Sequence, residues 1–188
     1  MSDRDEEITA AREIVALVFD KIADERGVHA ETAVSAAGRM AGTFLLRSCG
    51  LPLATLTPGA PVLSDAVNAK GPVLVELFQL VLGELGVTPD GNPSANATPA
   101  APLFTVPEMQ ARLDAGVGAI AERHGLGDEA TARAGAIATA MIVKQTAGVL
   151  DARAAFGIAT LGFVEGAKTV PPARVEAPAT KKPWYKVW

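Results

Sequence analysis

The feature that most constrains the fold of this chain is a pattern that occurs twice, 98 positions apart. Residues 22–42 read IADERGVHAETAVSAAGRMAG, and residues 120–140 read IAERHGLGDEATARAGAIATA. Aligned without gaps at this offset, residues 8–70 and 106–168 share 11 of 63 positions, among them Gly27 with Gly125, Gly50 with Gly148 and Gly59 with Gly157. In an alanine-rich chain, about one identity in ten is expected from composition alone. The pattern therefore indicates a duplicated unit, and the alternative is a chance likeness of two alanine-rich segments.

Apolar residues in both copies recur at spacings of three and four, which is the spacing of one face of an α-helix. In the first copy these residues are Ile8, Ala11, Val15, Phe19 and Ile22. The corresponding residues of the second copy are Val106, Met109, Leu113, Val117 and Ile120. No stretch alternates between apolar and polar residues over more than a few positions, so strands are not expected. The sequence predicts an all-α bundle with helices at 4–26, 30–49, 62–70, 72–86, 106–124, 128–147 and 151–168.

The chain has 188 residues, a length that suits a single domain with a proper core. We predict one all-α domain over 1–188, built from two tandem pseudo-symmetric repeats of about 63 residues (8–70 and 106–168) that cover each other's apolar faces. With the extra helix 72–86, repeat one spans 4–86. It is followed by a linker at 87–103, repeat two at 104–169 and a C-terminal tail at 170–188. Prolines at 171, 172, 178 and 183 prevent a counterpart of helix 72–86 after repeat two.

Turn and cap signals support these boundaries. Gly27, Gly50, Gly125 and Gly148 each follow a predicted helix, where a glycine can adopt the left-handed conformation that closes the helix. Thr105 and Glu108 have the spacing of a capping box at the start of helix 106–124. Asp128 is expected to cap helix 128–147. The matching residue of helix 30–49 is Ala30, so that cap is either weaker or supplied by His29.

Composition argues against several functional classes. The formal net charge is −4, and without clustered Lys and Arg we expect no nucleic-acid binding. Cys49 is the only cysteine, so neither an intramolecular disulfide nor a thiolate zinc cluster can form. The acidic N-terminus is unlike a secretory signal. The most apolar run, 134–143, is far shorter than the roughly 20 residues of a membrane span. We expect a soluble, cytoplasmic protein of bacterial type without a transmembrane segment.

Motifs for catalysis, metal binding and nucleotide binding are absent from the sequence. The two histidines, His29 and His124, do not correspond at the repeat offset, so a shared metal site is not favoured. Glu31 and Glu129 do correspond, and a first-turn carboxylate interacts favourably with the helix dipole; the alternative is a pair of carboxylates at the pseudo-axis. We predict no catalytic residue, no metal and no cofactor, and we lean against an enzyme while leaving that question open.

Two apolar segments are candidate interfaces. Helix 72–86, PVLVELFQLVLGELG, either covers the bundle or packs against a second copy, with Leu77, Phe78 and Val81 as candidate contacts. The tail holds both tryptophans and the only tyrosine, Trp184, Tyr185 and Trp188, among three lysines. We predict that these rings dock in a groove of their own bundle or of a partner. Base stacking and contact with a lipid surface are the alternatives that we rank lower.

Four basic residues are the candidate ligand-binding positions. Arg47 and Lys144 stand late in the two most apolar helices, and Lys70 and Lys168 correspond at the repeat offset. Together they would line a pocket for an anion between the repeats; the alternative is that each satisfies the last carbonyls of a helix.

Two functional hypotheses follow. The favoured one is a non-enzymatic helical protein that acts through homodimerisation or a protein partner. The alternative is a small-molecule binding protein or enzyme that uses a pocket between the repeats.

Overall fold

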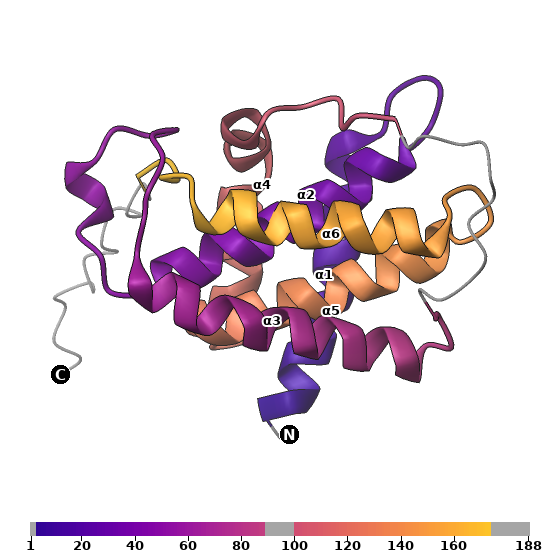
Figure 1. Cartoon of the computed structure of the whole chain (residues 1–188), viewed down its shortest axis with the longest axis horizontal. Coiled ribbons are helices and arrows are strands. Elements are labelled where there is room, and N and C mark those ends of the chain that lie inside the picture. Colours follow the sequence, from indigo (N-terminus) through magenta and orange to yellow (C-terminus); the bar gives the residue numbers. More distant parts are fainter. Residues whose placement is uncertain (1–2, 89–99, 174–188) are drawn as a thin grey trace, which may run out of the picture.

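The computed structural model describes residues 3–88 and 100–173 and is all-helical over these ranges. Six α-helices follow one another along the chain (Figure 1). They are α1 (Asp3–Ile22), α2 (Ala30–Arg47), α3 (Asp65–Glu84), α4 (Val106–Arg123), α5 (Asp128–Thr146) and α6 (Ala152–Ala167), with a short 3-10 helix at Leu53–Thr55. The predicted all-α bundle is confirmed.

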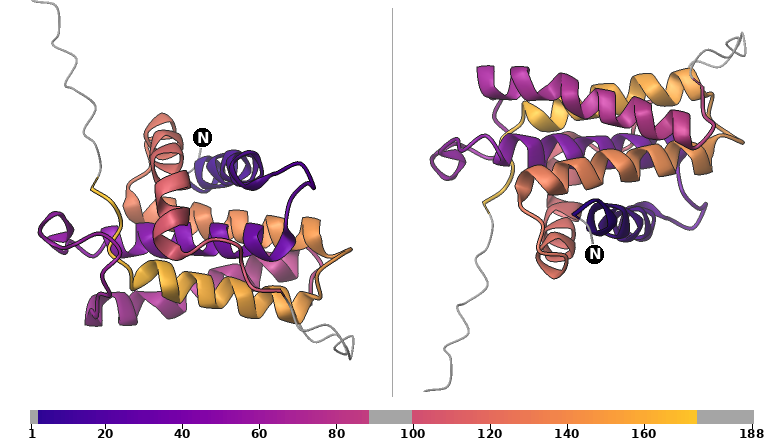
Figure 2. Two further views of the ribbon diagram at one scale, coloured as in Figure 1. Left: turned by 90° about the horizontal axis from the view of Figure 1, so that it is seen from above. Right: turned by 90° about the horizontal axis from the view of Figure 1, so that it is seen from below.

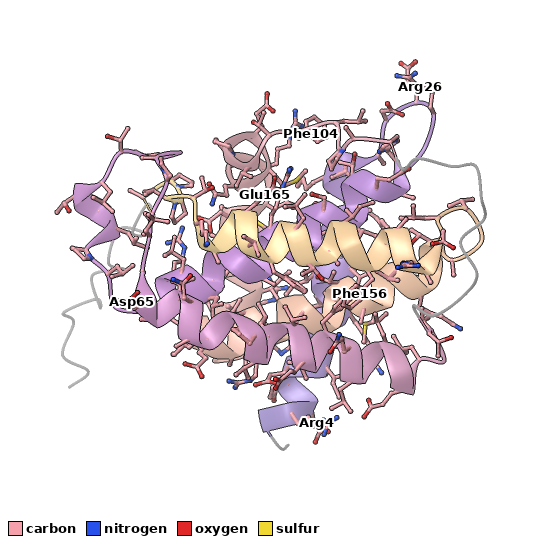
Figure 3. All side chains as sticks on the ribbon, in the orientation of Figure 1. Arg4, Arg26, Asp65, Phe104, Phe156 and Glu165 are labelled. Atoms are coloured by element: carbon pink, nitrogen blue, oxygen red, sulfur yellow. The ribbon has the colours of Figure 1, made fainter. Side chains whose placement is uncertain are left out.

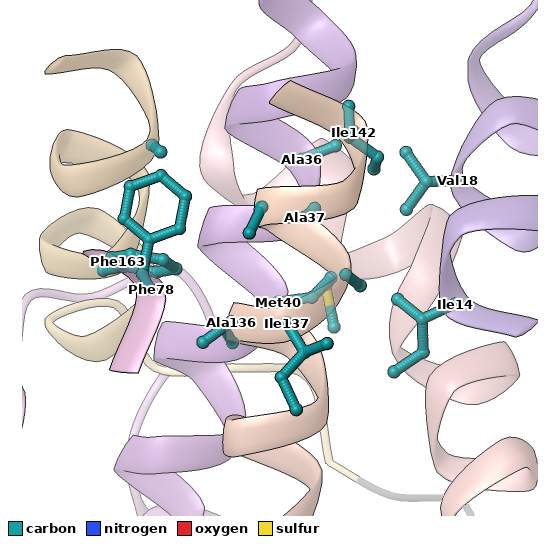
Figure 4. Close-up of a cluster of buried hydrophobic side chains, with 14 of the residues drawn as sticks. Ile14, Val18, Ala36, Ala37, Met40, Phe78, Ala136, Ile137, Ile142 and Phe163 are labelled. Carbon is teal, nitrogen blue, oxygen red and sulfur yellow. The ribbon is translucent and has the colours of Figure 1, made fainter. Parts of the chain in front are cut away.

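The helices are arranged in layers, which Figure 2 shows from two sides. Helices α2 and α5 form the central layer, α1 and α4 cover one of its faces, and α3 and α6 cover the other. A central helix must be apolar on most of its circumference, and α2 meets this requirement because 15 of its 18 residues are buried. Figure 4 shows the two halves of the core: Ile14 and Val18 lie on the α1 side, and Phe78 and Phe163 on the other.

Helices α2 and α6 approach each other at backbone distance. The contact is lined by glycines of both helices: Gly38, Gly42, Gly162 and Gly166. A Cβ atom placed on Gly42 would lie 2.7 Å from the backbone nitrogen of Ala167 and closer still to the carbonyl oxygen of Phe163. Only glycine permits this approach, and it binds α6 tightly to the central layer.

Helix α3 differs from the prediction because the segments 62–70 and 72–86 form one continuous helix, Asp65–Glu84, with Pro72 inside it. Proline removes the helical hydrogen bond to the carbonyl four residues earlier, here that of Asn68. Both Asn68 and Pro72 are exposed, so this carbonyl can be hydrated. Helix α1 is also shorter than predicted and ends at Ile22, because the chain turns at 24–27 through two backbone hydrogen bonds between Asp24 and Gly27.

The predicted repeat agrees with the helix bounds only in part. Moved back by 98 positions, α5 covers 30–48 and matches α2 at 30–47. Moved in the same way, α6 covers 54–69, whereas α3 begins at residue 65. The chain between α2 and α3 pairs with the segment after α6, since Gly59 and Ala60 exchange backbone hydrogen bonds with Val170. The duplication itself and the domain limits remain predictions.

Most of the predicted caps form. Gly27, Gly50 and Gly125 have φ angles of 102°, 66° and 63°, whereas Gly148 is not left-handed. The capping box of Thr105 and Glu108 is present, and His29 caps α2 by accepting from Thr32 N. The residue at the N-cap of α5 is Gly127 and not Asp128, which stands in the first turn.

Candidate functional site

Helix α3 is apolar but poorly covered by the rest of the bundle. Only 28% of its apolar stretch is buried. The buried residues are Val67, Leu74, Phe78, Val81 and Leu82, which form the face that packs on the bundle. The close glycine contacts that seat α6 on α2 have no equivalent at α3, where a Cβ on Gly71 or Gly83 would meet nothing within 4 Å. Most of this apolar helix therefore lies outside the hydrophobic core of the bundle.

The uncovered part of α3 carries an apolar stripe. Val73 and Leu80 are 61% and 56% exposed, and Leu77 between them is half-buried. Residues at positions i, i+4 and i+7 share one face of a helix. We call Val73, Leu77 and Leu80 the α3 stripe. Large exposed apolar side chains that line up in this way mark interaction surfaces more often than single exposed ones do.

A groove runs beside the α3 stripe, between α3 and α5. It consists of two hollows of about 270 and 400 Å³ that share Leu77 and Arg133 in their walls. Its apolar walls are Ala132, Ile137 and Met141 of α5, Ile8 of α1, Leu45 of α2, the stripe itself with Leu74 and Val81 on α3, and Leu85 at the C-cap of α3. A third hollow, of about 420 Å³, lies on the other side of α3 against α6 and includes Pro72, Val164 and Lys168.

Ion pairs stand at both ends of this groove. Lys70 pairs with Glu129 at one end, and Arg4 of α1, which is labelled in Figure 3, lies 3.5 Å from Glu84 at the other. The hydrogen bond between Lys70 and Glu129 raises the pKa of the lysine and lowers that of the glutamate. These pairs are exposed, so each contributes little to stability, but they fix where positive and negative charge lie along α3.

The predicted interface residues divide between core and surface. Leu77 belongs to the α3 stripe, but Phe78 is fully buried, with its ring 5.6 Å from that of Phe156 and 5.3 Å from that of Phe163. Val81 is also buried. As a correction, Phe78 and Val81 are core residues of the single chain, because α3 turns these positions toward α6 and α5. Trp184, Tyr185 and Trp188 lie outside the described residues.

The four predicted ligand-binding cations occupy separate places. Arg47 bonds to Asp114 at 2.7 Å and to the carbonyl of Pro172 at 3.2 Å. Lys70 pairs with Glu129 beside α5, whereas half-buried Lys168 lines the hollow between α3 and α6. Lys144, predicted to line the pocket, is exposed in the last turn of α5 and lines none of these hollows. No single hollow described here contains more than one of them.

Sequence reasoning missed Asp114, which bonds to Arg47, and the buried Gln110 one turn before it on α4. Asp114 and Gln110 on α4 are buried, and the amide of Gln110 donates to Thr43 at 3.0 Å and to the carbonyl of Thr169 at 3.3 Å. The signal was available, since Gln110 and Asp114 are four residues apart and adjoin the apolar stripe of their helix. This polar cluster holds α4, the end of α2 and the segment after α6 together. A second such link is Arg39, which bonds to Glu165 and to the carbonyl of Phe104 (Figure 3).

The histidines and acidic residues have structural partners. His124 at the end of α4 lies between two carboxylates of α1, with Nδ1 3.0 Å from Glu6 and Nε2 2.8 Å from Glu13. The hydrogen bonds to Glu6 and Glu13 raise the pKa of His124. Glu31 and Glu129 each have their own partners, the backbone nitrogen of Ala100 and the side chain of Lys70. Within residues 3–88 and 100–173, no three His, Cys, Asp or Glu side chains are grouped to hold a metal ion.

These observations define the class of protein as an all-α layered bundle in which the apolar helix α3 is incompletely covered. Among the described residues, α3 is also the only helix long and apolar enough to cross a membrane by length and composition; one such helix is weak evidence for a span. Comparison with known proteins gives no match: no family model, no curated protein and no solved structure is similar to this chain.

Proposed function

We propose that this chain is a non-enzymatic protein of the cytoplasm that acts by association, with the α3 stripe and its groove as the surface that receives another polypeptide. The observation that carries the proposal is the mismatch between the hydrophobicity of α3 and its burial. Burying an apolar side chain gains about 1.5–3 kcal/mol relative to leaving it exposed. Val73 and Leu80 obtain most of this gain only if a second surface covers them.

The alternative function, binding of an anion between the two halves of the chain, needs several cations around one cavity. Arg47 and Lys70 instead pair with carboxylates of α4 and α5, and Lys168 lies apart from both in the hollow between α3 and α6. Arg47 in particular is 9% exposed and neutralised by Asp114. Association therefore has the better support.

The test is site-specific photocrosslinking in the cells that produce the protein. A photoreactive amino acid replaces Leu80 in one variant and Val149 in a matched control; Val149 is 83% exposed but lies in the connection between α5 and α6. We expect a covalent adduct with a polypeptide at position 80 and none at position 149. If positions 73, 77 and 80 all fail to form an adduct, the proposed function is wrong.

A further inference from the structure

We propose that the polypeptide on the α3 surface is α3 of a second copy of this chain, which lies antiparallel to the first with a twofold axis between Glu76 and Leu77. This inference rests on the proposed function, because it uses the same surface. It adds the identity of the partner and the register in which the two helices meet.

The α3 stripe is complementary to itself about this axis. Val73 and Leu80 lie at equal distances on either side of it along the helix. In an antiparallel pair, each Val73 therefore meets the partner's Leu80, and the contact occurs twice. A surface patch of this kind gives a closed twofold dimer, the commonest form of homo-oligomer.

The charges beside the stripe select the antiparallel orientation. Lys70 and Glu84 lie 14 residues apart, about 21 Å along the helix and nearly four whole turns, so they share one flank of α3. Their side chains are 40% and 56% exposed. An antiparallel pair brings each Lys70 near the partner's Glu84, whereas a parallel pair would bring like charges together at both ends. Like charges at an interface oppose association.

The groove provides the space that the second helix needs. From Lys70 to Leu85 it follows α3 for about 22 Å. The partner's α3 would lie beside α3 and against Ile137 and Met141 of α5, and by symmetry α3 would lie against α5 of the partner. Helix-in-groove packing of this kind is a recurrent mode of recognition. The same register brings exposed Glu76 close to the partner's Glu76, so Glu76→Gln is expected to tighten the dimer about threefold.

Disulfide trapping tests the register and the orientation. In a Cys49→Ser background, which removes the only native thiol, purified Val73→Cys and Leu80→Cys chains are mixed and oxidised under mild conditions. In the antiparallel register, two copies of position 73 are about 10 Å apart along the helix, too far for the Cα separation of 4.4–6.8 Å that a disulfide needs. We expect about tenfold more crosslinked dimer in the mixture than in either variant alone.

Charge exchange tests the polar contacts independently. Lys70→Glu and Glu84→Lys are each expected to weaken the dimer about five- to tenfold at low salt, because each places like charges opposite one another in both copies. The variant with both changes is expected to regain the original affinity within about threefold. Within one chain the double change restores nothing, because position 70 still faces Glu129 and position 84 still faces Arg4.

The outcomes separate the inference from the proposed function. If Val73→Cys or Leu80→Cys alone crosslinks as efficiently as the mixture, the two helices meet in another register or orientation, which overturns the inference while association stands. An adduct at Leu80 with another protein, together with a monomeric mass of 19.3 kDa for the purified chain, also overturns only the inference. No adduct anywhere on the stripe overturns both. Crosslinking of the mixture, with recovery in the double charge variant, supports the inference.

Discussion

Replacing Gly42 by alanine is expected to force α2 and α6 apart. The new Cβ would lie 2.7 Å from the backbone nitrogen of Ala167 and 3.0 Å from the carbonyl carbon of Phe163, whereas ordinary contact begins at 3.4 Å. These are backbone atoms, so no rotation of a side chain relieves the clash. The helices must separate by more than 0.7 Å, the difference between 3.4 and 2.7 Å, because the carbonyl oxygen of Phe163 lies closer still to the new Cβ.

The expected cost follows from two opposing effects. A gap of 0.5–1 Å forfeits about a quarter to a half of each dispersion contact along the interface, and overpacking of a core typically costs about 1–3 kcal/mol. Alanine in place of glycine inside a helix recovers about 1 kcal/mol. Because backbone atoms of two residues of α6, Phe163 and Ala167, block the new methyl group, the upper part of the range of about 1–3 kcal/mol applies. The net loss in the free energy of unfolding is about 2 kcal/mol.

Chemical and thermal unfolding, followed by circular dichroism, measures this loss. For a chain of this size, about 1 kcal/mol corresponds to about 2–4 °C, so the melting temperature should fall by about 4–8 °C. Gly157→Ala is the matched control, because Gly157 is an exposed residue inside α6 and its Cβ would meet nothing within 4 Å. It should gain about 0.5–1 kcal/mol.

The two glycines should therefore respond with opposite signs to the same substitution. If Gly42→Ala is as stable as the original chain, the close approach of α2 and α6 is not a real constraint, and the explanation of why α6 is better seated than α3 is wrong.

Other perturbations have equally definite expectations. Because the pKa of His124 is raised and that of Glu13 is lowered, the stability that this contact adds is present in full between about pH 4.5 and 6.5. It is lost as the pH rises through the folded pKa of His124 or falls through that of Glu13. Asp114→Ala leaves the buried charge of Arg47 without its main counter-charge, and should cost about 3–5 kcal/mol. Pro72→Ala restores a hydrogen bond on an exposed face of α3 and should stabilise the chain by about 2 kcal/mol.

The controls for these variants use the same unfolding assay. The difference between the original chain and His124→Asn should shrink above neutral pH; a difference that grows with pH contradicts the reasoning. Arg47→Met combined with Asp114→Leu should cost less than Asp114→Ala alone, since an apolar pair leaves no buried charge. A loss of stability on replacing Pro72 would mean that the proline ring itself contributes to the packing of α3.

Local signals in the sequence predicted much of the secondary structure. The ends of α2, α4, α5 and α6 fall within two residues of the expected positions, because glycine, cap residues and apolar spacing act within one or two turns of a helix. The failures have local reasons too. Pro72 was taken as a helix start, but the helix continues through it because solvent can hydrate the carbonyl that the proline leaves unpaired. Residues 23–26 were taken as a last helical turn, but a backbone turn satisfies their polar groups instead.

The site was less predictable. Leu77, Phe78 and Val81 were predicted together as interface contacts, but Phe78 and Val81 belong to the core, and only Leu77 is half-buried at the surface. Apolar spacing defines a helix face without saying how far the rest of the bundle wraps around it. Likewise, the basic character of Arg47 was visible in the sequence, but its counter-charge Asp114 is 67 positions away and was found only in the folded chain.

The sequence by itself determined that this protein is helical and where most of its helices begin and end, because these properties depend on neighbouring residues. Only the tertiary structure decided that α6 sits tightly on α2 while α3 stays partly uncovered. That difference comes from glycines of two distant segments, Gly38 and Gly42 against Gly162 and Gly166, which allow contact only when both helices present them at the same place. Close packing is a property of matched surfaces, and the match exists only after the chain has folded.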